Sequence, residues 1–218
     1  LVYNKMLSER QETYEKYKDN QEMLKKQKFP TPAKYKEAFP FLKEVDSLAL
    51  ANAQMNLQKA YKNFFEGNAD FPKFKNRKSK QSYTTNCVNG NIALHNGHIK
   101  LPKLKLVKIK QHREIPANHK LKSCTISKTK SGKYYISILT EYEKAIQPKT
   151  IEKVVGLDFA MDGLYVESKQ GEKANYPRFY RQALDKLAKA QRILSKRKKG
   201  SARWNKQRLV VAKLHEKV

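Results

Sequence analysis

The sequence has only two cysteines, Cys87 and Cys124, and they stand far apart. Because they form no CxxC pair, the chain supplies no zinc site by itself, and two reduced, buried thiols are the simplest interpretation. The five histidines show no ligand spacing, and there is neither a Gly-rich phosphate-binding loop nor a defensible Ser/His/Asp arrangement. These absences exclude the usual sequence signatures of zinc fingers, P-loop enzymes and serine hydrolases.

Acidic residues are also scarce, with 20 Asp and Glu against 47 Lys and Arg and a net charge of +27. Such an excess of one charge repels itself in the folded chain and favours a polyanionic partner, of which nucleic acid is the first candidate. An anionic membrane is the second candidate, but the sequence has no long apolar stretch and no amphipathic anchor. The 218 residues, 39% of them hydrophobic, allow a lean core in one large or two modest domains.

Residues 1–66 carry apolar side chains at helical spacing and predict a helical region. The prolines of Phe29–Pro32 interrupt it, Asp46-Ser47 can cap the next helix, and Gly67 follows the end of that helix. Asn52 and Asn56 lie off the apolar stripe of this helix, on a face that is either simply solvated or used for binding. The sequence begins inside a helical pattern and stops without a helix-ending residue, so we expect it to be part of a longer chain.

Residues 67–150 read as short strands joined by tight turns, which predicts a small β-barrel. Asn96-Gly97 lies between two alternating runs and predicts a hairpin. A second hairpin is predicted from 123–127 and 134–140. Between the two hairpins, a further predicted strand has a basic outer face that could contact phosphates: Lys103, Lys105, Lys108 and Lys110.

Asp158 stands in the middle of an apolar run, within a hairpin predicted over 153–167. A buried carboxylate is costly unless it is paired or holds a metal, so Asp158 is a structural residue, a general acid or base, or a Mg²⁺ ligand. Spacing alone supports the structural and metal roles equally. Asp162 sits in an Asp-Gly turn and fits a backbone role better. Glu167 adds little support as a second ligand.

After Tyr176-Pro177 a long helix, a loop over 196–201 and another helix are predicted. The apolar stripe of the long helix comprises Phe179, Ala183, Leu187, Ala190 and Leu194. Fourteen Lys and Arg lie between Arg178 and Lys217, against only two acids. So one-sided a distribution favours contact with phosphates over a merely solvated surface. The residues expected to contact the nucleic-acid backbone here are Arg181, Lys189, Arg192, Lys196, Arg197, Lys198, Lys199, Arg203, Lys206 and Arg208.

Cations, aromatics and amides alternate over 70–85, where the helical region meets the strands. Cations can hold phosphates, amides can read base edges, and aromatic rings can stack or simply pack. A basic linker between two regions is an equally good interpretation of this composition.

Three sets of segments resemble the TnpB family of transposon-encoded RNA-guided nucleases, which is related to type V CRISPR effectors. They follow the order found in the family. The first comprises 2–7, 41–45 and 60–65, the second 71–75, 81–83, 99–102 and 129–135, and the third 155–158, 176–179, 186–187, 194–195, 198–201 and 212–217.

The resemblance implies an α+β multidomain fold: a helical recognition lobe over 1–66, a β-barrel wedge domain over 67–150 and the first part of a RuvC-like nuclease domain over 151–218. Asp158 then corresponds to the first catalytic aspartate, a Mg²⁺ ligand. The second and third acids of the family, a Glu and an Asp, and its four-cysteine zinc ribbon are expected beyond Val218, and the first wedge strand before Leu1.

The resemblance further implies an RNA-guided DNA endonuclease whose partners are a guide RNA and a double-stranded DNA target, with no membrane role, in the nucleoid-associated cytoplasm of a bacterium or archaeon. Guide pairing would supply most of the sequence specificity. A short flanking DNA motif would be read near Asn52, Asn56, Lys75, Arg77, Lys78, Gln81, Ser82, Tyr83 and Thr84. A nuclease-inactive RNA-guided repressor is the alternative, and a plain basic RNA chaperone is a third hypothesis.

Overall fold

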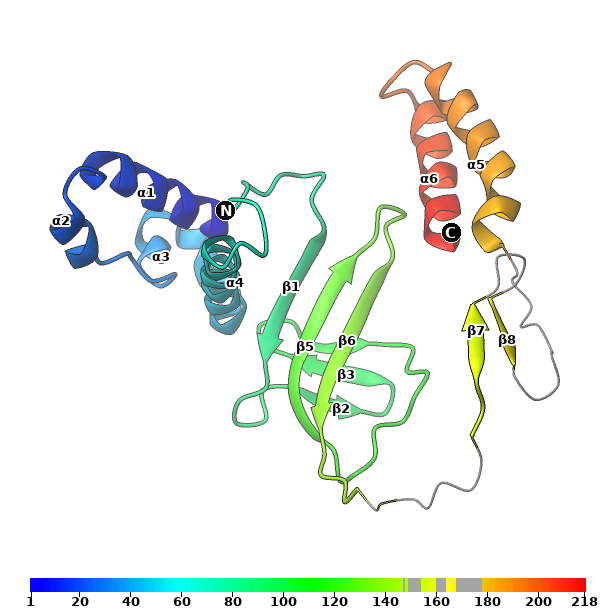
Figure 1. Ribbon diagram of the computed structural model, residues 1–218, viewed down its shortest axis with the longest axis horizontal. Coiled ribbons are helices and arrows are strands. Elements are labelled where there is room, and N and C mark those ends of the chain that lie inside the picture. The colour runs from blue at the N-terminus through cyan, green and yellow to red at the C-terminus, as the bar shows by residue number, and fades with distance from the viewer. Residues whose placement is uncertain (147, 149–153, 160–163, 168–177) are drawn as a thin grey trace. The chain divides into compact units, whose positions relative to one another are not determined.

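The structure is a computed structural model that describes residues 1–146, 148, 154–159, 164–167 and 178–218 (Figure 1). The chain is a mixture of helices and small sheets, and it divides into two compact units. The first unit comprises 1–129 and 133–143, and the second comprises 130–132 and 144–218. The predicted mixture of α and β structure is confirmed, whereas the division into three domains stays a prediction.

The first unit begins with the predicted helical region. It contains α1 (Val2–Tyr17), α2 (Gln21–Lys26), α3 (Tyr35–Ala38), the 3-10 helix η1 (Pro40–Glu44) and α4 (Ser47–Phe65). The chain leaves the helical conformation between α2 and α3, where Pro30 and Pro32 lie, as the sequence predicted.

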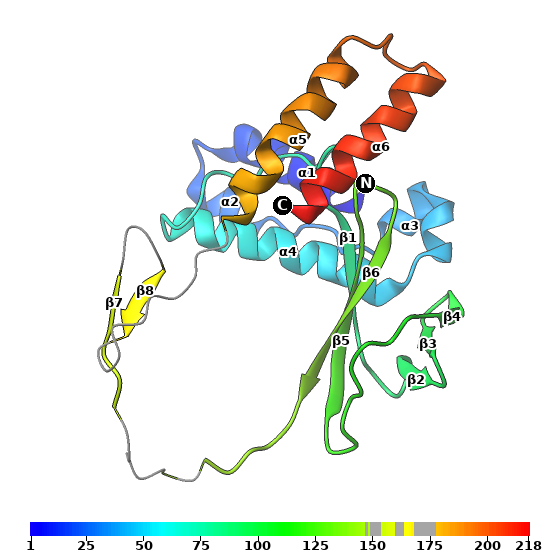
Figure 2. The ribbon, with the colours of Figure 1, turned by 90° about the vertical axis from the view of Figure 1, so that its right-hand side faces the viewer.

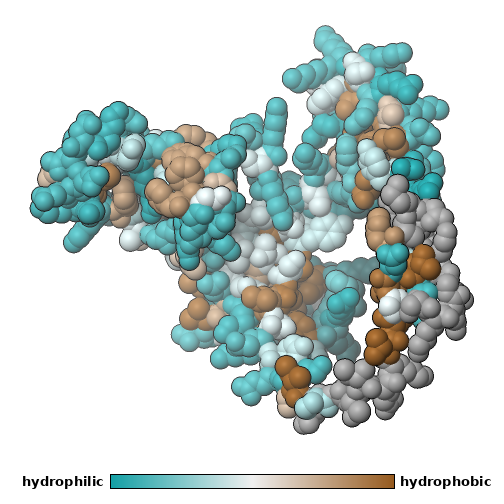
Figure 3. Space-filling view, in the orientation of Figure 1, coloured by the Kyte–Doolittle hydropathy of each residue, from teal (hydrophilic) through white to brown (hydrophobic). Residues whose placement is uncertain are grey.

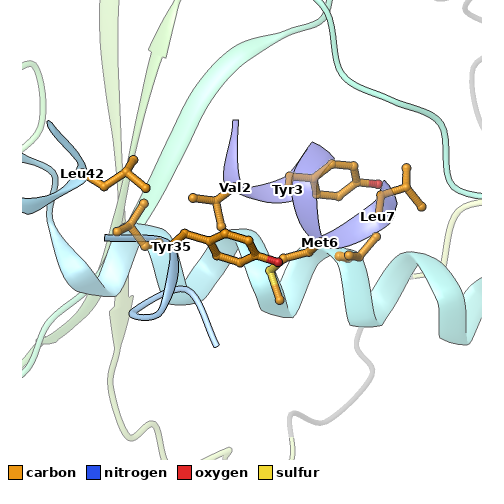
Figure 4. Close-up of a cluster of buried hydrophobic side chains, with 8 residues drawn as sticks. Val2, Tyr3, Met6, Leu7, Tyr35 and Leu42 are labelled. Carbon is orange, nitrogen blue, oxygen red and sulfur yellow. The ribbon is translucent and has the colours of Figure 1, made fainter. Parts of the chain in front are cut away.

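The helices enclose one cluster of buried side chains (Figure 4). Leu7 of α1 and Leu57 of α4 are fully buried at its centre, and Tyr35 of α3 packs against them from the side of the short helices. This apolar cluster packs α1 along α4. The first turn of α1 is therefore held near the segment that follows α4 in the sequence.

Six strands follow, in two antiparallel sheets of three (Figure 2). One sheet has the order β1 (Gln81–Asn86), β5 (Lys120–Lys128) and β6 (Tyr134–Glu141), and the other has the order β2 (Ala93–His95), β3 (His98–Leu101) and β4 (Lys105–Lys108). The hairpin predicted at Asn96-Gly97 is confirmed, because both residues have positive φ, 37° and 74°, as a two-residue type I′ turn requires.

The predicted small β-barrel is not supported, because the strands that the structure describes form no closed barrel. A barrel needs every strand paired on both sides, whereas β1 and β6 end one sheet and β2 and β4 end the other. The two sheets instead share a small core in which Ile99 and Leu101 of β3 meet Cys124 of β5. Short strands with tight turns are common to barrels and to packed sheets, so the local pattern did not distinguish them.

The second unit contains the hairpin of β7 (Leu157–Phe159) and β8 (Tyr165–Glu167), and the helices α5 (Phe179–Ser195) and α6 (Ala202–Lys217). The predicted Asp162-Gly163 turn and the Tyr176-Pro177 segment lie outside the described residues. Leu187 and Ala190 of α5 pack against Val211 of α6, so the two helices form a hairpin with a narrow apolar seam.

We find no helix with the length and apolar character needed to cross a membrane among the residues that the structure describes.

Candidate nucleic-acid interface

One carboxylate joins α4 to the neighbouring strand β1. Asp46 stands at the N-terminus of α4, where its Oδ1 accepts a hydrogen bond of 3.1 Å from the backbone N–H of Leu48. The cap predicted at this position is therefore confirmed. The second oxygen of Asp46, Oδ2, accepts a hydrogen bond from the hydroxyl of Thr85, which is buried in β1. Figures 1 and 2 show α4 beside β1, and Asp46 holds this arrangement at one end.

Asn52 lies near the same junction. Its Nδ2 donates to the backbone carbonyl of Leu48 at 2.9 Å and lies 3.5 Å from Oδ1 of Asn86, the last residue of β1. Asn56 is one helical turn further along α4 and is exposed. The two asparagines thus share a face of α4 that begins at the edge of the sheet and continues into solvent.

Residues 67–80, all of which the structure describes, form neither helix nor strand. Side chains hold this segment in place instead. The side-chain amide of Asn4 in α1 makes two hydrogen bonds to the backbone of Lys75: Nδ2 donates to the carbonyl at 2.7 Å, and Oδ1 accepts from the N–H at 2.9 Å. The ammonium of Lys75 lies 4.4 Å from the ring centre of Tyr3. Lys75 is exposed but has a defined position.

A turn follows at once. Oδ1 of Asn76 accepts from the backbone N–H groups of Lys78 at 2.8 Å and Ser79 at 3.2 Å. This turn presents Arg77 and Lys78 to solvent, and Nε2 of Gln81 then donates to the carbonyl of Ser79 at 3.0 Å. The predicted motif-reading residues from Lys75 to Gln81 are therefore held together by local hydrogen bonds.

The remaining predicted motif-reading residues lie in β1, on two different faces of its sheet. Successive side chains of a strand point to opposite faces, so Ser82 and Thr84 lie on one face while Gln81 and Tyr83 lie on the other. The hydroxyls of Thr84 and Thr125 are 2.8 Å apart across the β1–β5 pair. Burial raises the pKa of Tyr83, and the Asp46 carboxylate raises it further. The structure thus does not bring all nine predicted motif-reading residues onto one surface.

Three residues that organise this region were not predicted to do so. Asn4, Thr85 and Asn86 act through partners that are 71, 39 and 34 positions away in the sequence. No local pattern around these three residues indicated contacts with partners so distant in the sequence.

Asp158 lies in the middle of β7 and is exposed. It pairs with Val166 of β8, whereas Leu157 pairs with Glu167. Cross-strand partners share a face and neighbours in a strand do not, so Asp158 and Glu167 point to opposite faces of the hairpin. Glu167 consequently cannot join Asp158 at a common metal ion in this geometry.

Metal binding at Asp158 is not completed by other described residues. No group of three or more His, Cys, Asp or Glu side chains that could hold a metal ion occurs in the described ranges. Asp158 therefore offers a single hard oxygen ligand of the kind that Mg²⁺ prefers. Its role as a metal ligand stays a prediction.

The α5–α6 hairpin carries the densest positive charge of the second unit. Its acids are Asp185 and Glu216 alone. Teal, hydrophilic atoms cover most of these two helices in Figure 3. Arg197 is half-buried and donates from Nη1 to the carbonyl of Arg203 at 2.6 Å, so it closes the loop between the helices. The other predicted backbone-contacting residues of this hairpin are exposed: Arg181, Lys189, Arg192, Lys196, Lys198, Lys199, Arg203, Lys206 and Arg208.

The loop of this hairpin is locally determined. Ser201 caps α6 by accepting from the backbone N–H of Trp204 at 3.1 Å, and Gly200 has a φ of 86° that favours glycine. Gln207 of α6 donates to the carbonyl of Ala190 in α5 at 3.0 Å. The exposed cations Lys196, Lys198 and Lys199 are thereby presented from a defined loop.

The four predicted lysines of the first unit, Lys103, Lys105, Lys108 and Lys110, are exposed in and around β4. They lie beside no acidic strand partner, because Lys105 pairs with Leu101 and Lys108 with His98. They remain candidates for contacts with phosphate.

Comparison with known proteins finds one matching family and two similar proteins. Residues 137–218 match the OrfB_IS605 family, which is described as "Probable transposase". A Streptomyces pristinaespiralis protein named "Putative RNA-guided DNA endonuclease" is 31% identical over 219 residues, which cover 100% of this chain and 54% of that protein. An Escherichia coli K12 protein named "Putative RNA-guided DNA endonuclease InsQ" is 33% identical over 175 residues, which cover 80% of this chain and 42% of that protein.

These similarities agree with the resemblance seen in the sequence. The resemblance of this chain to the TnpB family is thereby confirmed. It spans about half the length of the curated relatives it matches.

Proposed function

We propose that this chain is part of an RNA-guided DNA endonuclease that binds a guide RNA, recognises a short motif beside its DNA target and cleaves the DNA with Mg²⁺. The observation that carries this proposal is the similarity over the whole chain to a relative named as an RNA-guided DNA endonuclease. The net charge of +27 supports a polyanionic partner independently of any relative.

The charges and hydrogen bonds of the described residues support two distinct roles. The exposed cations of α5–α6 and of β4 suit the backbones of a guide RNA and of the heteroduplex that it forms with DNA, since these contacts need charge rather than sequence readout. The segment from Lys75 to Gln81 combines cations with amides on a surface held by hydrogen bonds, which suits recognition of base edges beside the target.

Asp158 is the proposed first carboxylate of a RuvC-type site. It would hold Mg²⁺ as one ligand, and the remaining ligands would be those that the resemblance places after residue 218. A Mg²⁺ ion bound there would supply electrostatic stabilisation to the phosphate that is cleaved. The exposure of Asp158 on β7 supports access to such a partner.

The test uses the full-length protein with its guide RNA, Mg²⁺ and DNA duplexes that carry a matched target beside a randomised flank. Wild type should cut a subset of flanks, and Asp158→Ala should reduce cutting at least a thousandfold while guide-RNA affinity changes less than threefold. Glu167→Gln is the matched control, because Glu167 lies on the other face of the same hairpin. It should retain cutting within a few-fold of wild type.

The outcomes separate the rival functions. Guided binding of DNA without cutting by the wild type would favour a nuclease-inactive repressor. RNA binding that is indifferent to RNA structure and needs no DNA target would favour a chaperone. Equal loss of cutting in Asp158→Ala and Glu167→Gln would reject the assigned role of Asp158.

A further inference from the structure

Two consecutive residues in the first turn of α1 hold one residue of the segment before β1. The Asn4 side chain bonds both the N–H and the carbonyl of Lys75, at 2.9 and 2.7 Å, and the ring of Tyr3 lies 4.4 Å from the Lys75 ammonium. The backbone and the side chain of Lys75 are therefore both fixed from α1, which is 71 positions away in the sequence.

These two hydrogen bonds take the place of the backbone hydrogen bonds that a helix or a strand would supply. Residues 67–80 form neither helix nor strand, so the backbone of Lys75 has no ladder partner of its own. The Asn4 side-chain amide donates one hydrogen bond to Lys75 and accepts one from it, which is the pairing that a neighbouring strand would give. Pro72 is buried three residues earlier, so the segment is held at two points.

The residues that follow Lys75 are also held in place. The turn at Asn76 begins at the next residue, places Arg77 and Lys78 in solvent, and leads through Ser79 to Gln81 at the start of β1. β1 is itself held to α4 through Thr85. The cations and amides from Lys75 to Gln81 thus lie between an anchored Lys75 and an anchored strand.

We infer that Asn4 is a positioning residue that sets where the segment 75–81 meets DNA, and so sets the preference for the flanking motif. Both polar atoms of Asn4 are engaged with Lys75, so it acts through that residue rather than by touching DNA. The anchored helix α1 is fixed in turn by Leu7 in the buried core. This inference rests on the proposed function.

The experiment uses the full-length protein with guide RNA and the randomised-flank DNA library. Asn4→Ala removes both hydrogen bonds to Lys75. Asn4→Asp keeps the acceptor for the Lys75 N–H and lacks the donor to its carbonyl. Thr13→Ala is the matched control, because Thr13 also lies on α1 and its hydroxyl donates within the helix to the carbonyl of Glu9 at 2.6 Å.

Two readouts are needed, and one of them does not depend on activity. Amide hydrogen exchange at Lys75 should be at least tenfold faster in Asn4→Ala than in wild type, and unchanged in Thr13→Ala. The ratio of cutting on the best flank to cutting on the average flank should fall at least tenfold in Asn4→Ala and less in Asn4→Asp. Guide-RNA affinity should change less than threefold in all three variants.

The outcomes distinguish this inference from the function on which it rests. If wild type selects flanks and Asn4→Ala selects them equally well, the role of Asn4 is overturned while the endonuclease stands. If Asn4→Ala is poorly folded, Asn4→Asp decides by its flank ratio, because it lacks the donor to the Lys75 carbonyl, and an unchanged ratio overturns the role of Asn4. If wild type shows no guided, flank-dependent cutting, the proposed function fails first and this inference fails with it.

Discussion

Asp46 divides its two carboxylate oxygens between the first turn of α4 and the hydroxyl of Thr85 in β1, so one side chain both caps a helix and joins it to a sheet. Thr85 is 1% exposed, and the α4–β1 contact is where the helical part of the first unit meets its strands. Removing either partner leaves the other without its hydrogen bond in a largely dry environment.

The first prediction is therefore that Thr85→Val destabilises the protein by about 1–3 kcal/mol, the cost of leaving a partly buried acceptor unpaired. Asp46→Asn should cost less than Asp46→Ala, because asparagine remains a good N-cap. Equilibrium unfolding in urea measures all three.

Thr84→Val serves as the control for the Thr85 substitution. Thr84 is the neighbouring residue on the opposite face, and its partner Thr125 is only half-buried, so the Thr125 hydroxyl can find water. A loss in Thr84→Val as large as that in Thr85→Val would contradict a special role for the contact with Asp46.

Only one of the two hydrogen bonds of the Asp46 side chain could be predicted from the sequence. The cap was predictable because a capping residue acts on the N–H groups two and three positions later. The bond to Thr85 was not, since nothing local to either residue indicates a partner 39 positions away. The same reason explains why the barrel was predicted incorrectly. The Asn96-Gly97 hairpin was predictable from its turn, but whether a sheet closes depends on pairing between distant strands.

Most of the α5–α6 hairpin, by contrast, could be predicted from the sequence. Its helices, loop and apolar seam follow from local spacing, and Leu187 and Ala190 of the predicted stripe are buried. Phe179, which was assigned to the same stripe, is 70% exposed because it lies in the first turn of α5. Periodicity predicted the face of the helix correctly and overestimated how far its burial extends.

A second prediction concerns that seam. Leu187→Ala should destabilise the hairpin by about 2–4 kcal/mol, because a buried leucine loses both its transfer energy and its packing. Leu184→Ala, on the same helix but 41% exposed, should cost less than about 1 kcal/mol. Trp204, the single tryptophan of the sequence, lies in α6, so its fluorescence during urea unfolding reports on this hairpin. Equal losses in the two variants would show that the seam does not stabilise it.

A third prediction concerns thiol reactivity. Burial raises the pKa of Cys124 to about 11, and the nearby Cys87 contributes to the shift. Since the thiolate is the reactive form, iodoacetamide at about pH 8 should modify Cys124 at least tenfold more slowly than the half-buried Cys87, as read by peptide mass spectrometry. In denaturant the two rates should converge. Similar rates in the folded protein would contradict the burial of Cys124.

The same shift in the pKa of Cys124 gives a fourth prediction with a definite sign. The folded pKa lies above the ordinary value near 9, so the folded state keeps a proton that the unfolded state loses first as pH rises. The stabilisation is complete below about pH 9 and is lost as pH rises through about 11. Compared with Cys124→Ala, the free energy of unfolding of wild type should fall more steeply over this range. Parallel pH profiles would contradict the shift.

The last prediction tests the charge of the α5–α6 loop. Lys196, Lys198 and Lys199 are exposed, and replacing all three with glutamine removes three cations without touching the apolar seam. If each contacts one phosphate, the slope of log affinity against log salt concentration should become shallower by about 2–3, since each contact with duplex contributes about 0.9.

The control for this salt dependence replaces Lys25, Lys26 and Lys28 with glutamine, which changes the net charge equally on exposed residues at and beyond the end of α2. If affinity responded only to the total charge of +27, both triple variants would reduce the slope alike. A reduction confined to the α5–α6 variant would locate direct phosphate contacts in its loop, because counterions are released only where cations and phosphates meet.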